Sequence, residues 1–103
     1  IQYRQGDILF VKMDETISGD KIARDTKNRL VVAEGEATGH AHTIHDDKVT
    51  MYRNDVLNRA WVVVEEQANV VHEEHDTITL ESGTWRVIYQ RQYVRGETRR
   101  VLD

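Results

Sequence analysis

Short apolar runs rich in β-branched residues recur along this chain at intervals of roughly ten residues, separated by Gly, Asn and Asp. This spacing is typical of antiparallel β proteins whose strands are joined by short turns. No stretch keeps the 3.6-residue apolar period of an amphipathic helix. The pattern therefore predicts an all-β fold, a small single-domain barrel or sandwich of about eight strands.

The expected strands cover most of the sequence. They are residues 8–13, 29–33, 40–45, 49–52, 60–65, 70–71, 77–80 and 85–94. Residues 14–28 are expected to form the longest irregular connection. Residues 81–84 are expected to form a hairpin turn in which Gly83 supplies a positive φ. Residues 95–103 are expected to form a short helix or a docking arm. The predicted core consists of Ile8, Phe10, Leu30, Val32, Val62, Val64, Ile78, Leu80, Val87 and Tyr89.

Length and composition narrow the class of protein. The chain has 103 residues, which predicts one domain over residues 1–103, and its 39% hydrophobic and 31% charged residues are those of a globular protein. The absence of cysteine excludes disulfides, thiolate ligands and a cysteine nucleophile, and it fits a reducing compartment. No apolar stretch is long enough to span a bilayer and no signal peptide opens the chain, so we expect a cytoplasmic protein with no membrane partner.

The distribution of charged residues indicates which kinds of binding partner to expect. A net charge of −4 argues against a general nucleic-acid binder, because phosphate contacts need a basic surface. Arginines nevertheless gather toward the end of the chain, which leaves an RNA or protein patch open. We favour instead their pairing with the Glu-rich middle, within one chain or across a homodimer. These arginines are Arg86, Arg91, Arg95, Arg99 and Arg100.

The five histidines form two short clusters between residues 40 and 75. His40 and His42 are two apart, so on a strand they share a face at a spacing of roughly 6.5–7 Å, which suits two imidazole ligands of one metal ion. His45 alternates to the other face unless the turn at Asp46 and Asp47 returns it. These three histidines are the first set of candidate ligands.

The second cluster is His72-Glu73-Glu74-His75. A straight strand would direct His72 and His75 to opposite faces, whereas a bulge or one helical turn would bring them together. Should both clusters meet, imidazoles and a carboxylate would form a divalent metal site for Zn, Ni, Mn or Fe. The simplest chemistry there is hydrolysis by metal-activated water, with Glu73 or Glu74 as general base. No substrate follows from the sequence, and enzymatic activity stays open.

Other interpretations remain. The histidines would also suit a metal-free acid, base or pH-responsive site, since their unperturbed pKa is near neutrality. A non-catalytic binding or assembly module would be a homo-oligomer formed through exposed edge strands, with the histidines as structural groups. The segment His75-Asp76-Thr77-Ile78 has the His-x-Thr-apolar form of two-motif phosphoesterases, but it lacks a second copy. The acidic pairs Glu65-Glu66 and Glu73-Glu74 could supply glycosidic chemistry, although such runs are more often a solvated face.

Two resemblances add to this picture. His40-Ala41-His42 followed by Asp46 or Asp47 resembles the first metal motif of cupins, which implies a cupin-like barrel and a third ligand at His72 or His75. This chain has Asp where cupins have Glu, and Arg86 stands where the later cupin motif has its histidine. Separately, the pattern Gly35-Glu36-Ala37-Thr38-Gly39-His40-Ala41-His42, with the later His-Glu-Glu-His, is similar to a group of short bacterial and phage proteins of unassigned function.

Overall fold

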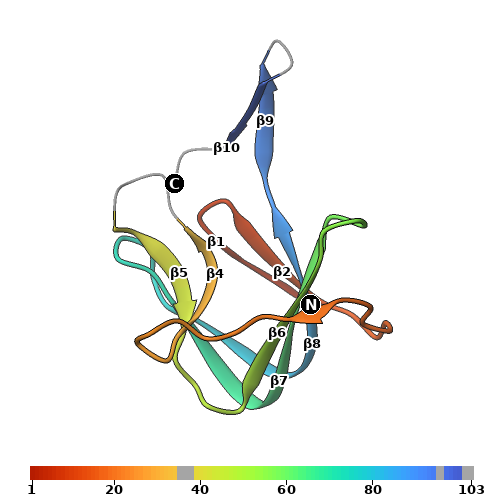
Figure 1. Cartoon of the computed structure of the whole chain (residues 1–103). Coiled ribbons are helices and arrows are strands. Elements are labelled where there is room, and N and C mark those ends of the chain that lie inside the picture. Colours follow the sequence, from red (N-terminus) through yellow and green to blue (C-terminus); the bar gives the residue numbers. More distant parts are fainter. Residues whose placement is uncertain (35–38, 95–96, 101–103) are drawn as a thin grey trace.

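The structure, a computed structural model, describes residues 1–34, 39–94 and 97–100. Within these residues the fold is all-β, and the main sheet has eight strands, all paired antiparallel (Figure 1). Its strands are β1 (Gln2–Gln5), β2 (Ile8–Lys12), β3 (Asp20–Lys21), β4 (Leu30–Glu34), β5 (Ala41–Ile44), β6 (Val49–Asn54), β7 (Arg59–Val71) and β8 (Ile78–Tyr89). The prediction of an all-β fold is confirmed.

The sheet is bent but does not close into a barrel. Its main path runs β1-β2-β8-β7-β5-β4, with β6 beside β7 and β3 beside β6. Strands β1 and β4 each have one paired neighbour in the described chain, so they are edges. The hydroxyl of Tyr89 on β8 donates a hydrogen bond to the carbonyl of Val32 on β4 (2.8 Å), which holds these two strands together without ladder pairing. The prediction of a barrel or sandwich of about eight strands is thus confirmed in its all-β class and strand number, whereas the sheet is open and not a closed barrel.

The bend of the sheet is centred on a bulge in β7. Val64 is paired with Gly83 of β8, but the next pair is Gln67 with Glu81, so the register shifts between them. The one extra residue bends β7, and the first half of the strand pairs with β6 while its second half pairs with β5. One long strand thereby serves both halves of the sheet.

The predicted turn at residues 81–84 is wrong, because β8 runs through them without interruption. Gly83 does adopt a positive φ, 142°, but it does so inside the strand, opposite the bulge in β7. The actual hairpin that the sequence interpretation missed is β1–β2, where Gly6 (φ 59°) and Asp7 form a two-residue turn.

The core lies on the concave face of the sheet. Eight of the ten predicted core residues are buried, and the other two, Ile78 and Tyr89, pack against the cluster from partly buried positions. Trp85 is the largest side chain in this core and is fully buried. Trp61 is buried outside it, where its indole N–H donates to Glu15 (2.7 Å). The irregular segment 13–19 thus covers the outer face of β7.

The end of the chain forms a separate hairpin of β9 (Arg91–Val94) and β10 (Glu97–Arg100), which extends away from the main sheet (Figure 1). A helix was one of two expectations for residues 95–103; residues 97–100 form a strand instead, and residues 95–96 and 101–103 lie outside the described residues. Residues 35–38 lie outside them as well.

A candidate metal centre of four histidines

Strand β5 places the first cluster at the edge of the core. His42 is 0% exposed and pairs in register with Ala33 of β4. His40 comes just before the strand, and its side chain is 24% exposed. His42 is therefore enclosed in the core, whereas His40, which precedes the strand, lies nearer to solvent.

The loop between β7 and β8 brings His72 and His75 to the same side of the chain, although they are three residues apart. Nδ1 of His72 accepts hydrogen bonds from the backbone N–H groups of Glu74 (3.0 Å) and His75 (3.3 Å). These bonds curl the loop around the His72 ring, so the chain does not continue as a straight strand there. As a result the rings of His72 and His75 lie 4.6 Å apart between centroids, on the same side of the chain.

The two clusters meet, and His72 is at the centre of the group. Its ring centroid lies 4.4 Å from that of His42, 4.6 Å from that of His75 and 5.6 Å from that of His40. His42 and His75 are stacked nearly parallel at 6.2 Å. We call His40, His42, His72 and His75 the histidine cluster. It extends from the fully buried His42 to the partly exposed His40.

Two polar residues of the β1–β2 hairpin enclose the buried end of the cluster. Asp7 is 2% exposed, and its Oδ1 lies 3.7 Å from Nε2 of His42. Gln5 is also 2% exposed, and its Oε1 lies 2.8 Å from Nδ1 of His42. The amide nitrogen of Gln5 donates to the carbonyls of Val70 (2.8 Å) and Asp76 (2.9 Å). The sequence interpretation missed both residues; the only sequence signal was the Gly6-Asp7 turn, which placed a polar pair next to a strand.

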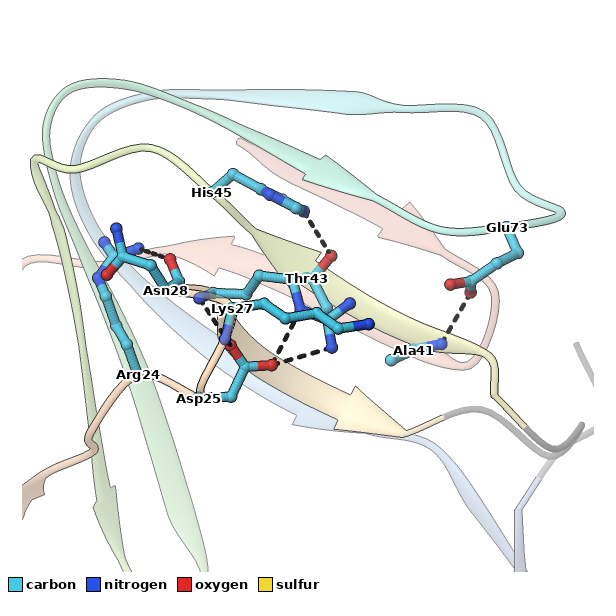
Figure 2. Close-up of polar contacts among 9 residues, drawn as sticks. Arg24, Asp25, Lys27, Asn28, Ala41, Thr43, His45 and Glu73 are labelled. Carbon is cyan, nitrogen blue, oxygen red and sulfur yellow. Dashed lines mark hydrogen bonds and ion pairs between the residues drawn. The ribbon is translucent and has the colours of Figure 1, made fainter.

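The carboxylates of the loop lie at the exposed end. Glu73 accepts a hydrogen bond from the backbone N–H of Ala41 (2.8 Å), which ties the loop to the start of β5 (Figure 2). This bond lowers the pKa of the Glu73 carboxyl below its usual value. One ligand atom each from His40, His72 and Glu73 lies within 4.8 Å of the others, a separation that one metal ion could bridge. Glu74 is more exposed, with an oxygen 3.9 Å from Nδ1 of His40.

The remaining candidates from the sequence lie elsewhere. The ring contacts of the described residues join the four members of the histidine cluster and leave out His45. His45 is exposed, with its Nε2 3.3 Å from the hydroxyl of Thr43 (Figure 2). Asp46 accepts a hydrogen bond from the backbone N–H of Asn69 (2.9 Å), which fixes the end of β5 beside β7. Asp47 is exposed in the turn before β6.

Of the five arginines considered as a basic patch, Arg86 has a defined partner. Arg86 makes two hydrogen bonds to the carboxylate of Glu15, at 3.0 and 2.8 Å. Its partner is thus in the N-terminal segment and not in the Glu-rich middle. The side chains of the other four arginines lie outside the described residues.

The fold and the site together define a class: a small antiparallel β domain with a cluster of histidines at one end of its core. Residues 4–90 match a family described as "Domain of unknown function (DUF8820)", and the chain belongs to that family. The match includes the whole histidine cluster together with Gln5 and Asp7. No curated protein and no solved structure matches the chain. No helix in the described part of the chain is long and apolar enough to cross a membrane.

Proposed function

We propose that this chain is a divalent-metal-binding domain whose metal is held by the histidine cluster, with Asp7 as a carboxylate ligand. The main support for this proposal is the spacing of His42 and Asp7. Their facing polar atoms are 3.7 Å apart, which is too long for a hydrogen bond. Two ligand atoms about 2.1 Å from one tetrahedral metal are separated by about 3.4 Å, so the pair is spaced as two ligands of one ion would be.

The groups around His42 and Asp7 favour a metal site over a simple ion pair between these two residues. The rings of His72 and His75 lie 4.4 and 6.2 Å from that of His42, and the ring of His40 lies 5.6 Å from that of His72. Neutral imidazole and carboxylate are the donors that Zn, Ni, Mn and Fe accept. A divalent metal ion would place two positive charges beside the buried carboxylate of Asp7.

Such a metal would lower the pKa of a bound water and so supply a hydroxide near neutral pH. Of the two glutamates suggested as general base, Glu74 is better placed for this role. Its side chain is 62% exposed and lies beside His40 at the open end of the cluster. Glu73 already holds the backbone of Ala41, which makes it a loop anchor. Hydrolysis of a small-molecule substrate is therefore the reaction type that we propose for the loaded site.

Metal analysis of protein purified without a histidine tag tests this proposal. We expect about one Zn, Ni or Mn per chain after incubation with the metal and desalting. His75→Ala should lose this metal, because His75 belongs to the cluster. His45→Ala is the matched control and should keep it, since His45 is exposed just after β5 and is not part of the cluster. A wild-type metal content near zero under all three incubations would refute the proposal.

The alternative is a homo-oligomeric assembly module, and the observation that favours it is that the described sheet is open and has edge strands, among them β1 and β4. Tyr3 of β1 is 36% exposed on one of these edges. In that case Tyr3→Lys should change the mass measured by light scattering, while His75→Ala should not. A mass that neither variant changes, together with loss of the metal in His75→Ala, supports the metal site.

A further inference from the structure

The histidine cluster contains two rings whose hydrogen bonds determine which nitrogen carries the proton. In a neutral imidazole one nitrogen is a donor and the other an acceptor. His42 and His72 both have identified partners at Nδ1, but the two partners are of opposite kinds. Their rings are also neighbours, with centroids 4.4 Å apart.

At His42 the partner is an acceptor. The amide nitrogen of Gln5 donates to two backbone carbonyls, those of Val70 and Asp76, which fixes the orientation of the amide. The oxygen of that amide therefore faces His42, at 2.8 Å from Nδ1. An amide oxygen can only accept, so Nδ1 of His42 must carry the hydrogen. In the neutral ring the lone pair is then on Nε2, the nitrogen that faces Asp7.

At His72 the partners are donors. The backbone N–H groups of Glu74 and His75 both point at Nδ1. A backbone N–H can only donate, so Nδ1 of His72 must hold the lone pair, and Nε2 carries the hydrogen. A metal ligand needs a lone pair, and in this arrangement the lone pair of His72 is already occupied by the loop.

We infer that Gln5 and the loop at residues 73–75 hold His42 and His72 in opposite tautomers, so that His42 presents a lone pair at Nε2 and His72 an N–H donor. Gln5 is then a positioning residue that acts through His42. Resting on the proposed function, this divides the cluster into roles: the metal takes Nε2 of His42, and His72 donates a hydrogen bond beside it. A ligand histidine whose other nitrogen donates to a fixed acceptor is the usual arrangement in metal sites.

The test is long-range ¹H–¹⁵N correlation of the histidine rings in metal-free protein, at about pH 8.5, roughly two units above the ordinary histidine pKa. We expect hydrogen on Nδ1 of His42 and on Nε2 of His72. The same tautomer in both rings would overturn the inference. This measurement uses the wild-type chain and needs no variant to fold.

Variants then test Gln5. Gln5→Leu removes the acceptor, so His42 should lose its preference for hydrogen on Nδ1 while His72 keeps its own tautomer. Gln67→Leu, an exposed glutamine on β7, is the matched control and should change neither ring. An unchanged His42 tautomer in folded Gln5→Leu would remove Gln5 from the argument.

Zinc titration separates this inference from the proposed function. We expect Zn²⁺ to shift the Nε2 signal of His42 and to leave Nδ1 of His72 hydrogen-bonded, and Gln5→Leu should weaken zinc binding about 10- to 100-fold. Opposite tautomers without any zinc binding would support the tautomer assignment and refute the metal proposal. Zinc binding through a His72 nitrogen would refute the assigned roles and support the metal proposal.

Discussion

The carboxylate of Asp7 faces the imidazole of His42 across 3.7 Å of the protein interior, and both side chains are almost completely buried. Asp7 reaches this position because the two-residue turn after β1 returns the chain directly into β2. A carboxyl group is thus held in the core at the point where the histidine cluster begins. Substitution of Asp7 therefore tests both the fold and the proposed metal site.

Asp7→Asn should have opposite effects on the metal-free and the metal-bound protein. Without metal, removal of a buried carboxylate should leave the free energy of unfolding unchanged or increase it. With metal, loss of an anionic ligand should weaken zinc binding by about tenfold or more. Urea unfolding in EDTA and zinc calorimetry measure the two effects. Equal zinc affinity in both proteins would show that Asp7 is not a ligand.

Metal should stabilise the folded chain. A ligand that binds only the native state at 100 times its Kd adds about 2.7 kcal/mol to the free energy of unfolding. For a domain of this size that corresponds to a rise in Tm of roughly 10 to 20 °C. Thermal melts with Zn²⁺, and again after EDTA, measure the rise and its reversal. The His45→Ala variant should behave like wild type, and an unchanged Tm in wild-type protein would contradict the prediction.

His42→Ala should destabilise the metal-free chain, which makes it a poor probe of function alone. The ring is 0% exposed and is packed among Gln5, Asp7 and His72. Its removal leaves a cavity and deprives Gln5 of its hydrogen bond, at a cost of about 2–4 kcal/mol. His45→Ala should cost less than about 0.5 kcal/mol, because that ring is exposed. Urea denaturation of both variants gives the comparison, and equal midpoints would contradict it.

Glu15 should contribute stability that is lost in acid. Its hydrogen bond from Trp61, and then its contacts with Arg86, lower its pKa below the ordinary 4.5. A carboxyl with a lowered pKa in the folded state stabilises the fold above pH 4.5, and this contribution disappears as the pH falls through the folded-state pKa. Glu15→Gln should therefore be less stable than wild type by about 1 kcal/mol at neutral pH and equally stable near pH 2.

The quantity to measure is the difference in free energy of unfolding between wild type and Glu15→Gln, by urea unfolding from neutral pH to about pH 2. Asp25 would remain as a source of acid lability in both. Its pKa is lowered by the backbone N–H of Arg29, and it lies in a network with Lys27 and Arg29 (Figure 2). A stability difference that did not change with pH would contradict the role of Glu15.

Gly83→Ala should destabilise β8. The residue adopts φ 142°, which L side chains rarely do, and an added Cβ would lie 2.7 Å from Cε of Lys12. The lysine can move away, so the backbone conformation is the main cost, about 1–3 kcal/mol. Ser82→Ala, exposed and next in the strand, should change stability by less than about 0.5 kcal/mol. Equal unfolding midpoints in urea would show that Gly83 is not constrained.

The sequence predicted strands well where apolar alternation was strong, and it failed where turn residues are used inside a strand. The segment around Gly83 resembles a hairpin turn in composition, but it pairs with β7 and so continues as strand β8. The positive φ of Gly83 occurs opposite the bulge in β7. Strand β1 was missed because its first residues are exposed and polar, so no alternating pattern marks it.

The site was predicted in part. The spacing of His40 and His42 indicated the first cluster, and the meeting of both clusters was a condition that only the fold could decide. Gln5 and Asp7 could not be identified, because a polar residue near a turn is ordinarily exposed. Their burial results from the packing of the β1–β2 hairpin against residues 70–76, a contact between distant parts of the chain.

The curled loop after β7 also sets an order of events during synthesis. The enclosure of His42 needs residues 5–7 and residues 70–76 at once. A growing polypeptide on the ribosome exposes His40 and His42 well before residue 76 has emerged. If the proposed metal site is correct, selection among metal ions would therefore occur in the folded chain, since the nascent chain offers only an open pair of imidazoles.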